Sequence, residues 1–189
     1  MEAFLTTFGV VALGEIGDKT QLVAMLLAAR FRRPLPLIAG MVLATLANHA
    51  LAAYAGTWVR AMIPPDVLRW VIGFSFLALA AWSLKADKAD EPGRSLDRYG
   101  PFVTSLVCFF LAEFGDKTQI ATLALAVRFN ALLPVIAGSS LGMTLVDALT
   151  MFFTTAFAHR LPVRVMRLAA AALFAVLGLL ALFGGKIEL

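Results

Sequence analysis

Two stretches of this chain carry ionisable residues inside otherwise apolar sequence. Both read Glu-x-Gly-Asp-Lys-Thr-Gln, at Glu15–Gln21 and at Glu113–Gln119. Each copy brings two carboxylates, a lysine, a threonine hydroxyl and a glutamine amide. Carboxylate, amide and hydroxyl oxygens suit hard divalent cations such as Mg²⁺, Ca²⁺ and Mn²⁺. The chemistry that this motif favours is therefore the binding of a divalent cation.

The carboxylates are the expected metal ligands, and the other polar motif residues are expected to support them. On a continuous helix, Glu15 and Asp18 share one face at i, i+3, and Lys19 can reach Glu15 at i+4. At Gly17 a second helix can come close, or the helix can open and release carbonyl oxygens. The predicted ligands are Glu15, Asp18, Glu113 and Asp116, and the predicted supporting residues of the motifs are Lys19, Thr20, Gln21, Lys117, Thr118 and Gln119.

The elements that must position these groups are membrane helices. Of the 189 residues, 61% are hydrophobic and 15% are charged, whereas soluble domains hold about 45–50% apolar and about 25% charged residues. A bilayer core of about 30 Å needs roughly 20 apolar residues per helix. Six segments qualify, and they run near 3–29, 35–60, 67–84, 101–127, 132–158 and 163–183. The predicted fold class is an all-α membrane protein with six transmembrane helices, and the motifs lie in the first and the fourth.

The position of the motifs inside apolar spans has an energetic consequence. A charge at mid-span costs about 2.5–3.5 kcal/mol on insertion scales, so six unpaired charges would cost about 15–20 kcal/mol. Such groups must pair, face water or bind an ion. One alternative treats each motif as a buried ion-pair clasp, in which Lys19 neutralises Glu15 or Asp18. That alternative explains neither the duplication nor the ratio of four carboxylates to two lysines, so we favour a transport site.

The two halves of the chain resemble each other. With an offset of 98 residues, 11–45 aligns with 109–143 without a gap, and 17 of these 35 positions are identical. Each half holds three spans, and an odd number of spans makes the second half enter from the opposite side. This predicts a 3+3 inverted-topology repeat, with the site at the interface between the repeats. The predicted domains are a first three-helix repeat at 1–84, a cytoplasmic linker at 85–100 and a second repeat at 101–189.

Basic residues indicate the orientation. Ten lysines and arginines follow spans one, three and five, and four lie on the other side. Because cytoplasmic loops carry the excess of positive charge, both termini are expected on the non-cytoplasmic side. The net charge of +4 does not predict nucleic acid binding, since the basic residues lie at the ends of apolar runs.

Spans two and five carry further polar residues. Asn48 and Asp147 match if one residue is inserted between the halves, and both are expected to support the site. For His49 the expected role is a hydrogen-bonded helix contact rather than a ligand. Gly138 and Gly142 form a Gly-x-x-x-Gly spacing that permits close helix packing, either inside the protein or between two copies, so a homodimer is left open.

The duplicated motif on spans one and four resembles that of the six-helix cation/proton exchanger family, which includes the Golgi manganese and calcium transporters of eukaryotes and the manganese exporters of bacteria. The resemblance covers essentially the whole chain, and neither motif departs from the pattern. It implies export of Mn²⁺, or of Ca²⁺, in exchange for protons, with no permanent cofactor. The family's acidic residues correspond to Glu15, Asp18, Glu113 and Asp116. The short termini and linker fit the bacterial members, which predicts a bacterial inner membrane protein.

The expected mechanism is alternating access, in which protons replace the metal on buried carboxylates after the halves rock. Two alternatives belong to other classes. The same acidic site could attract small basic amino acids for export. Paired carboxylates with a metal could also serve a membrane enzyme that acts on a lipid-linked substrate, but no Ser/His nucleophile arrangement is present. The sequence therefore predicts a transporter and not an enzyme.

Overall fold

The computed structural model describes residues 1–85, 94–152 and 163–183, and every regular element among them is a helix. The elements are α1 (Glu2–Glu15), α2 (Lys19–Phe31), α3 (Pro34–Met62), α4 (Pro65–Ser83), the 3₁₀ helix η1 (Arg94–Tyr99), α5 (Gly100–Glu113), α6 (Lys117–Phe129), α7 (Leu132–Phe152) and α9 (Val163–Phe183). The all-helical class is confirmed for these residues. The first and fourth predicted spans are each divided into two helices. Outside the described residues lie parts of several predicted segments: 86–93 of the linker, the end of the fifth span, the break before the sixth span, and Lys186.

Local sequence signals explain where these helices begin and end. Pro34 and Pro65 open α3 and α4, where the fixed φ of proline suits a first helical turn and its missing N–H is not needed. Arg32 and Asn130 follow α2 and α6 in the left-handed conformation, with φ of 52° and 48°. The N–H of each bonds back to the last turn of its helix, at 3.0 Å in both cases. Such a left-handed residue is a common way to end a helix.

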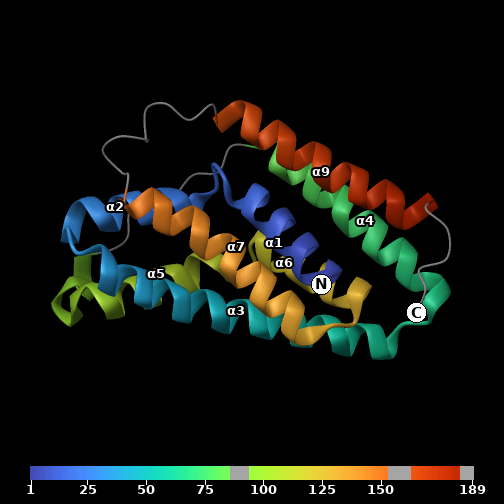
Figure 1. The fold of residues 1–189 in the computed structure, drawn as a ribbon, viewed down its shortest axis with the longest axis horizontal. Helices are drawn as coiled ribbons and strands as arrows, with labels where there is room; N and C mark the ends of the chain where they lie inside the picture. The colour runs from blue at the N-terminus through green and yellow to red at the C-terminus, as the bar shows by residue number, and fades with distance from the viewer. Residues whose placement is uncertain (86–93, 153–162, 184–189) are drawn as a thin grey trace.

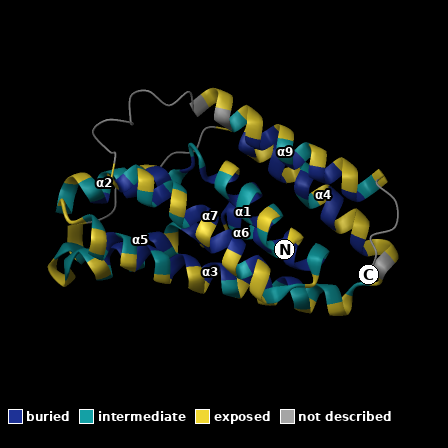
Figure 2. Cartoon of the chain, in the orientation of Figure 1, coloured by how far each residue is buried: buried dark blue, intermediate teal, exposed yellow. Residues whose placement is uncertain are grey.

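Figure 1 shows how the helices are arranged. α4 and α9 lie side by side as a pair, and the pair packs on α6 and α1. α1, α3, α6 and α7 form the centre of the molecule, while α2 and α5 lie toward one end of its long axis. Buried faces point between the helices and exposed apolar faces point outward (Figure 2). Among the described residues, three helices are long and apolar enough to cross a membrane alone, at Pro34–Met62, Asp66–Ser83 and Leu132–Phe152.

Two glycines at equivalent positions of the repeat mark close approaches between helices from different halves of the sequence. A Cβ at Gly40 on α3 would lie 2.3 Å from the carbonyl oxygen of Phe102 on α5. A Cβ at Gly138 on α7 would lie 2.5 Å from the carbonyl oxygen of Phe4 on α1. The second contact repeats the first with both partners displaced by 98 residues (138 − 40 and 102 − 4). α3 therefore packs on α5, and α7 packs on α1, through equivalent backbone contacts that join the two halves.

We expect Gly40→Ala and Gly138→Ala each to lower the free energy of unfolding by about 1–3 kcal/mol or more, because overpacking forces the backbones apart. The obstructing atom in each case is a backbone carbonyl oxygen, which cannot rotate away. Gly9 in α1 has nothing within 4 Å of its added Cβ, so Gly9→Ala is the matched control and is expected to gain up to about 1 kcal/mol. Denaturant unfolding in detergent micelles measures all three, and equal effects at Gly9 and Gly138 would contradict the packing argument.

Candidate cation-binding site

Each motif interrupts a helix. α1 ends at Glu15 and α2 begins at Lys19, and the second copy repeats this break 98 residues later. Gly17 and Gly115 lie in the breaks with φ of 82° and 77°, a conformation that costs other residues roughly 1–2 kcal/mol. Helical spacing does not apply across such a break. The prediction that Glu15 and Asp18 share one face of a continuous helix is therefore wrong, and the alternative of a locally opened helix is the one that is observed.

The two motif glutamines hold these breaks in place. The Oε1 atom of Gln21 accepts a hydrogen bond from the backbone N–H of Gly17 at 2.9 Å. The Oε1 atom of Gln119 accepts the equivalent bond from Gly115 at 2.7 Å. The sequence predicts that these amides supply oxygens that assist a cation. In the structure their oxygens stabilise the opened backbone, since a break in a helix leaves backbone N–H groups without their intrahelical acceptors.

The amide nitrogens of the same glutamines reach the neighbouring long helices. The Nε2 atom of Gln21 donates to Thr150 Oγ1 on α7 at 2.9 Å. The Nε2 atom of Gln119 lies 3.4 Å from Asn48 Oδ1 on α3. Thr150 is a contact that sequence reasoning missed. Its signal is the i, i+3 spacing from Asp147, which places both residues on one face of α7.

The lysines pair across the two motifs rather than within them. Lys19 Nζ lies 3.1 Å from Asp116 Oδ1, and Lys117 forms the reciprocal ion pair with Asp18. The pairing of Lys19 with Glu15 suggested by the sequence is not found, because the break turns the two residues onto separate helices. The Lys117 side chain is 2% exposed, whereas that of Lys19 is 28% exposed. The two pairs therefore join the halves of the molecule, and they differ in their access to solvent.

The motif threonines lie beside the same aspartates. Thr20 and Thr118 are fully buried, and each hydroxyl lies 3.5 Å from Oδ2 of the aspartate in its own motif. The predicted supporting residues Thr20 and Thr118 are therefore placed with Asp18 and Asp116. They add neutral oxygen atoms to the two ion pairs.

Glu113 is surrounded by polar side chains from α3. Thr45 Oγ1 donates a hydrogen bond to Glu113 Oε1 at 3.0 Å. His49 Nε2 lies 4.0 Å from Glu113 Oε2. Asn48, one of the predicted supporting residues, donates from Nδ2 to the carbonyl oxygen of Phe110 at 3.1 Å. All of these α3 side chains are 0% exposed.

Glu15 has a different environment from that of Glu113. Both Glu15 and Asp147 are 0% exposed, and within the described part of the chain none of their four carboxyl oxygens has a hydrogen-bond partner. Asp147 lies close enough to Glu15 to repel it when both groups are charged. A buried carboxylate without a partner is strongly destabilising, so such a group is stable only as the neutral acid or with a cation bound.

The described residues thus bring five buried carboxylates and two lysines together. The acids are Glu15, Asp18, Glu113, Asp116 and Asp147. In this arrangement the lysines engage one aspartate of each motif, and no three His, Cys, Asp or Glu side chains of the described ranges lie close enough to hold one metal ion. A cation that binds to all four motif carboxylates must therefore displace the lysines.

Apolar helices around a buried set of carboxylates define a membrane protein that handles cations. The chain belongs to the divalent cation/proton antiporter family GDT1, whose profile matches residues 3–91 and 101–188. This confirms the resemblance inferred from the motif. The family consists of transporters, so the prediction that the chain is not an enzyme is confirmed, and cation transport across a membrane is its general activity.

Relatives in bacteria and plants extend this result. A Vibrio cholerae protein named "Putative manganese exporter" is 46% identical over 184 residues, which cover 97% of this chain and 92% of the relative. A Synechocystis protein named GDT1-like protein sll0615 is 29% identical, with 92% of this chain and 93% of the relative covered. The GDT1-like protein 5 of Arabidopsis thaliana is 26% identical, with 95% and 94% covered. No solved structure matches the chain significantly.

Proposed function

We propose that this chain exports divalent cations in exchange for protons, with Mn²⁺ as the main cargo and Ca²⁺ as the alternative. The observation that carries the proposal is the excess of buried carboxylates over lysines. Two acids form ion pairs with Lys19 and Lys117, and Glu15, Glu113 and Asp147 are three further buried acids beside them. Oxygen ligands suit Mn²⁺ and Ca²⁺ alike. The name of the Vibrio cholerae relative supports Mn²⁺.

In the proposed mechanism the lysines act as tethered counter-ions of the empty site. Once the two lysines move away from the aspartates, the dehydrated ion binds to the four motif carboxylates, which are Glu15, Asp18, Glu113 and Asp116. Thr20, Thr118, Asn48 and Asp147 support them, while Gln21 and Gln119 keep the breaks open. After the halves rock, protons replace the metal on the carboxylates, since a buried acid is stable in its neutral form. The reciprocal contacts of Lys19 and Lys117 support this scheme because they span the interface that must open.

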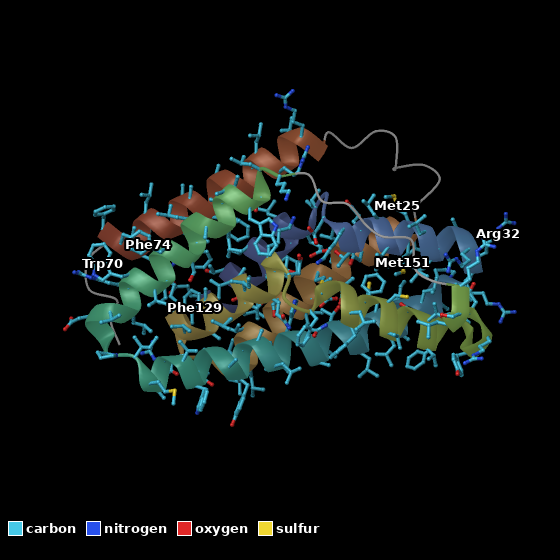
Figure 3. The ribbon with its side chains drawn as sticks, turned by 180° about the vertical axis from the view of Figure 1, so that it is seen from behind. Met25, Arg32, Trp70, Phe74, Phe129 and Met151 are labelled. Carbon is cyan, nitrogen blue, oxygen red and sulfur yellow. The ribbon has the colours of Figure 1, made fainter. Side chains whose placement is uncertain are left out.

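We further propose that the helices form six spans as a 3+3 inverted repeat, divided at 1–84, 85–100 and 101–189. α1 and α2 hold 14 and 13 residues, and at about 1.5 Å per residue each reaches only about 20 Å. Together they reach across a core of about 30 Å. The ends of the equivalent helices α2 and α6, marked by Arg32 and Phe129, lie toward opposite sides of the molecule (Figure 3). This opposition supports inversion, as do the family matches that begin 98 residues apart (101 − 3).

Contacts at the two ends support the proposed orientation. Arg30, at the end of α2, pairs with Asp97 of η1 at 3.2 Å, so this helix end and the linker share one side, which we assign to the cytoplasm. Arg60, at the end of α3, donates to the carbonyl oxygen of Val127 in α6 at 2.8 Å. These residues mark the other side. The proposal places both termini outside the cytoplasm, in a bacterial inner membrane.

Reconstitution into lipid vesicles tests the transport proposal. With an imposed proton gradient, we expect Mn²⁺ flux coupled to counterflow of protons. Free lysine added as a solute is expected neither to be transported nor to compete with Mn²⁺. The measurement is a metal-sensitive dye together with a pH dye in the same vesicles. Mn²⁺ flux that ignores the proton gradient would contradict antiport, and lysine flux without metal flux would favour the export of basic amino acids.

A further inference from the structure

His49 is a buried polar side chain that the proposed mechanism does not yet use. It lies on α3 and is 0% exposed. Within the described residues, neither of its ring nitrogens has a hydrogen-bond partner. The hydrogen-bonded helix contact expected from the sequence is therefore not observed. A buried imidazole without a partner requires an explanation, because buried polar groups are nearly always bonded.

The neighbours of His49 show what its ring faces. Thr45, Asn48 and His49 have the spacing i, i+3 and i+4, so they share one face of α3. Thr45 donates to Glu113, and Asn48 donates to the carbonyl oxygen of Phe110. The Nε2 atom of His49 lies 4.0 Å from Glu113 Oε2, too far for a hydrogen bond. The imidazole and the carboxylate therefore face each other with neither bound to the other.

A metal ion fits the separation between these two atoms. Zinc, a first-row metal ion, binds His nitrogen and carboxylate oxygen at about 2.0–2.2 Å, so two ligands of such an ion lie between about 3 Å apart when adjacent and about 4.3 Å apart when opposite. The 4.0 Å distance between His49 Nε2 and Glu113 Oε2 falls in this range. Further ligands would come from Asp18 and Asp116 once the lysines release them, and these side chains would also have to move closer, since no three His, Cys, Asp or Glu side chains of the described residues are now close enough to hold a metal ion.

The nitrogen donor occurs in only one half of the chain. With one residue inserted between the halves, Asn48 corresponds to Asp147, and His49 corresponds to Ala148. Glu113 therefore lies 4.0 Å from an imidazole nitrogen, whereas Asp147 is close enough to repel both Glu15 and Glu113 when these groups are charged. The repeat alone does not account for this difference. The imidazole of His49 thus adds one nitrogen atom, on one side, to a site whose other proposed ligands are oxygen atoms.

We propose that His49 binds the transported ion through Nε2 beside Glu113 and thereby makes the site prefer Mn²⁺ to Ca²⁺. Ca²⁺ takes oxygen ligands from proteins. Imidazole binds first-row transition metal ions and is their commonest protein nitrogen ligand. A neutral nitrogen in place of one oxygen thus disfavours Ca²⁺ more than Mn²⁺. This inference rests on the proposed function, because it assigns selectivity to the same site.

Two measurements test the role of His49. Pulsed electron paramagnetic resonance of Mn²⁺ bound to the purified full chain is expected to detect a directly coordinated histidine nitrogen, identified by labelling histidine with the heavy nitrogen isotope. The signal is expected to vanish in His49→Gln. In vesicles, His49→Gln is expected to lower the ratio of Mn²⁺ to Ca²⁺ flux by about tenfold or more, since losing even a residue that only supports a metal ligand costs about 10–100-fold in affinity.

Ser105→Ala is the matched control for His49→Gln. Ser105 is also fully buried at the contact of α3 with α5, where it donates to the carbonyl oxygen of Leu37 at 2.6 Å. We expect this variant to keep the native flux ratio and nitrogen signal. The inference about His49 would be overturned, and the proposed function kept, by either of two results. The first is a native chain that moves Mn²⁺ but shows no histidine nitrogen at the metal, and the second is a ratio of Mn²⁺ to Ca²⁺ flux in His49→Gln that equals the native ratio. A native chain that moves no divalent cation would overturn the proposed function as well.

Discussion

Asp18→Asn is expected to lower the free energy of unfolding by about 3–5 kcal/mol, because it removes the ion-pair partner of a buried charge. That charge is Lys117, whose side chain is 2% exposed. Asp116→Asn, at the equivalent position, is expected to cost only about 1 kcal/mol, since partly exposed ion pairs contribute about that much. Its partner Lys19 is 28% exposed and can be hydrated. Two aspartates that the repeat makes equivalent are thus expected to differ by several kilocalories per mole.

Denaturant unfolding in detergent measures the stabilities of these variants. The decisive control is the double variant Asp18→Asn/Lys117→Met, which removes both charges. It is expected to recover most of the stability that Asp18→Asn loses. Equal losses in the two aspartate variants, or a double variant as unstable as the single one, would contradict the charge argument.

Glu15→Gln is expected to abolish Mn²⁺ flux while the protein stays folded. The carboxyl group of Glu15 is fully buried and has no hydrogen-bond partner among the described residues. A neutral amide of the same shape costs less to bury than a carboxylate, so the free energy of unfolding is expected to stay within about 1 kcal/mol of the native value or to rise. The amide can neither take up a proton nor neutralise a metal ion. Flux is therefore expected to fall to the level of vesicles without protein.

Glu2→Gln is the matched control for this prediction, because it makes the same substitution in the same helix at an exposed position. Its flux and its unfolding are expected to match those of the native chain. Initial rates of Mn²⁺ entry into vesicles, normalised to the folded protein recovered, give the comparison. A Glu15→Gln chain that folds and still moves Mn²⁺ at the native rate would remove Glu15 from the proposed ligand set.

Much of the fold follows from local patterns that the sequence displays openly. Apolar runs of sufficient length place the helices to within a few residues, and Pro34 and Pro65 open two of them. The 98-residue repeat predicts equivalent elements, and the contacts of Gly40 and Gly138 repeat with the same displacement. Periodicity and composition act along the chain, so they can be detected without knowing which helices meet.

The internal geometry of the site does not follow from spacing. The positive φ of Gly17 divides one expected helix into α1 and α2, and this break separates Lys19 from Glu15. Glycine tolerates both a helix interior and a left-handed turn, so its presence alone cannot distinguish a continuous helix from a broken one. The roles of Gln21 and Gln119 as acceptors for the opened backbone follow from the break.

The sequence by itself determined the helical class and the internal repeat, and it predicted the acidic residues of the site and their oxygen chemistry. Only the tertiary structure decided which charges meet, because the exchange of Lys19 and Lys117 between the motifs joins residues almost a hundred positions apart. It also decided that His49 lies beside Glu113 and that Asp147 lies near both Glu15 and Glu113. The physical reason is that composition sets the free-energy cost of burying charges, whereas the packing of α1, α3, α5 and α7 decides which neighbours offset it.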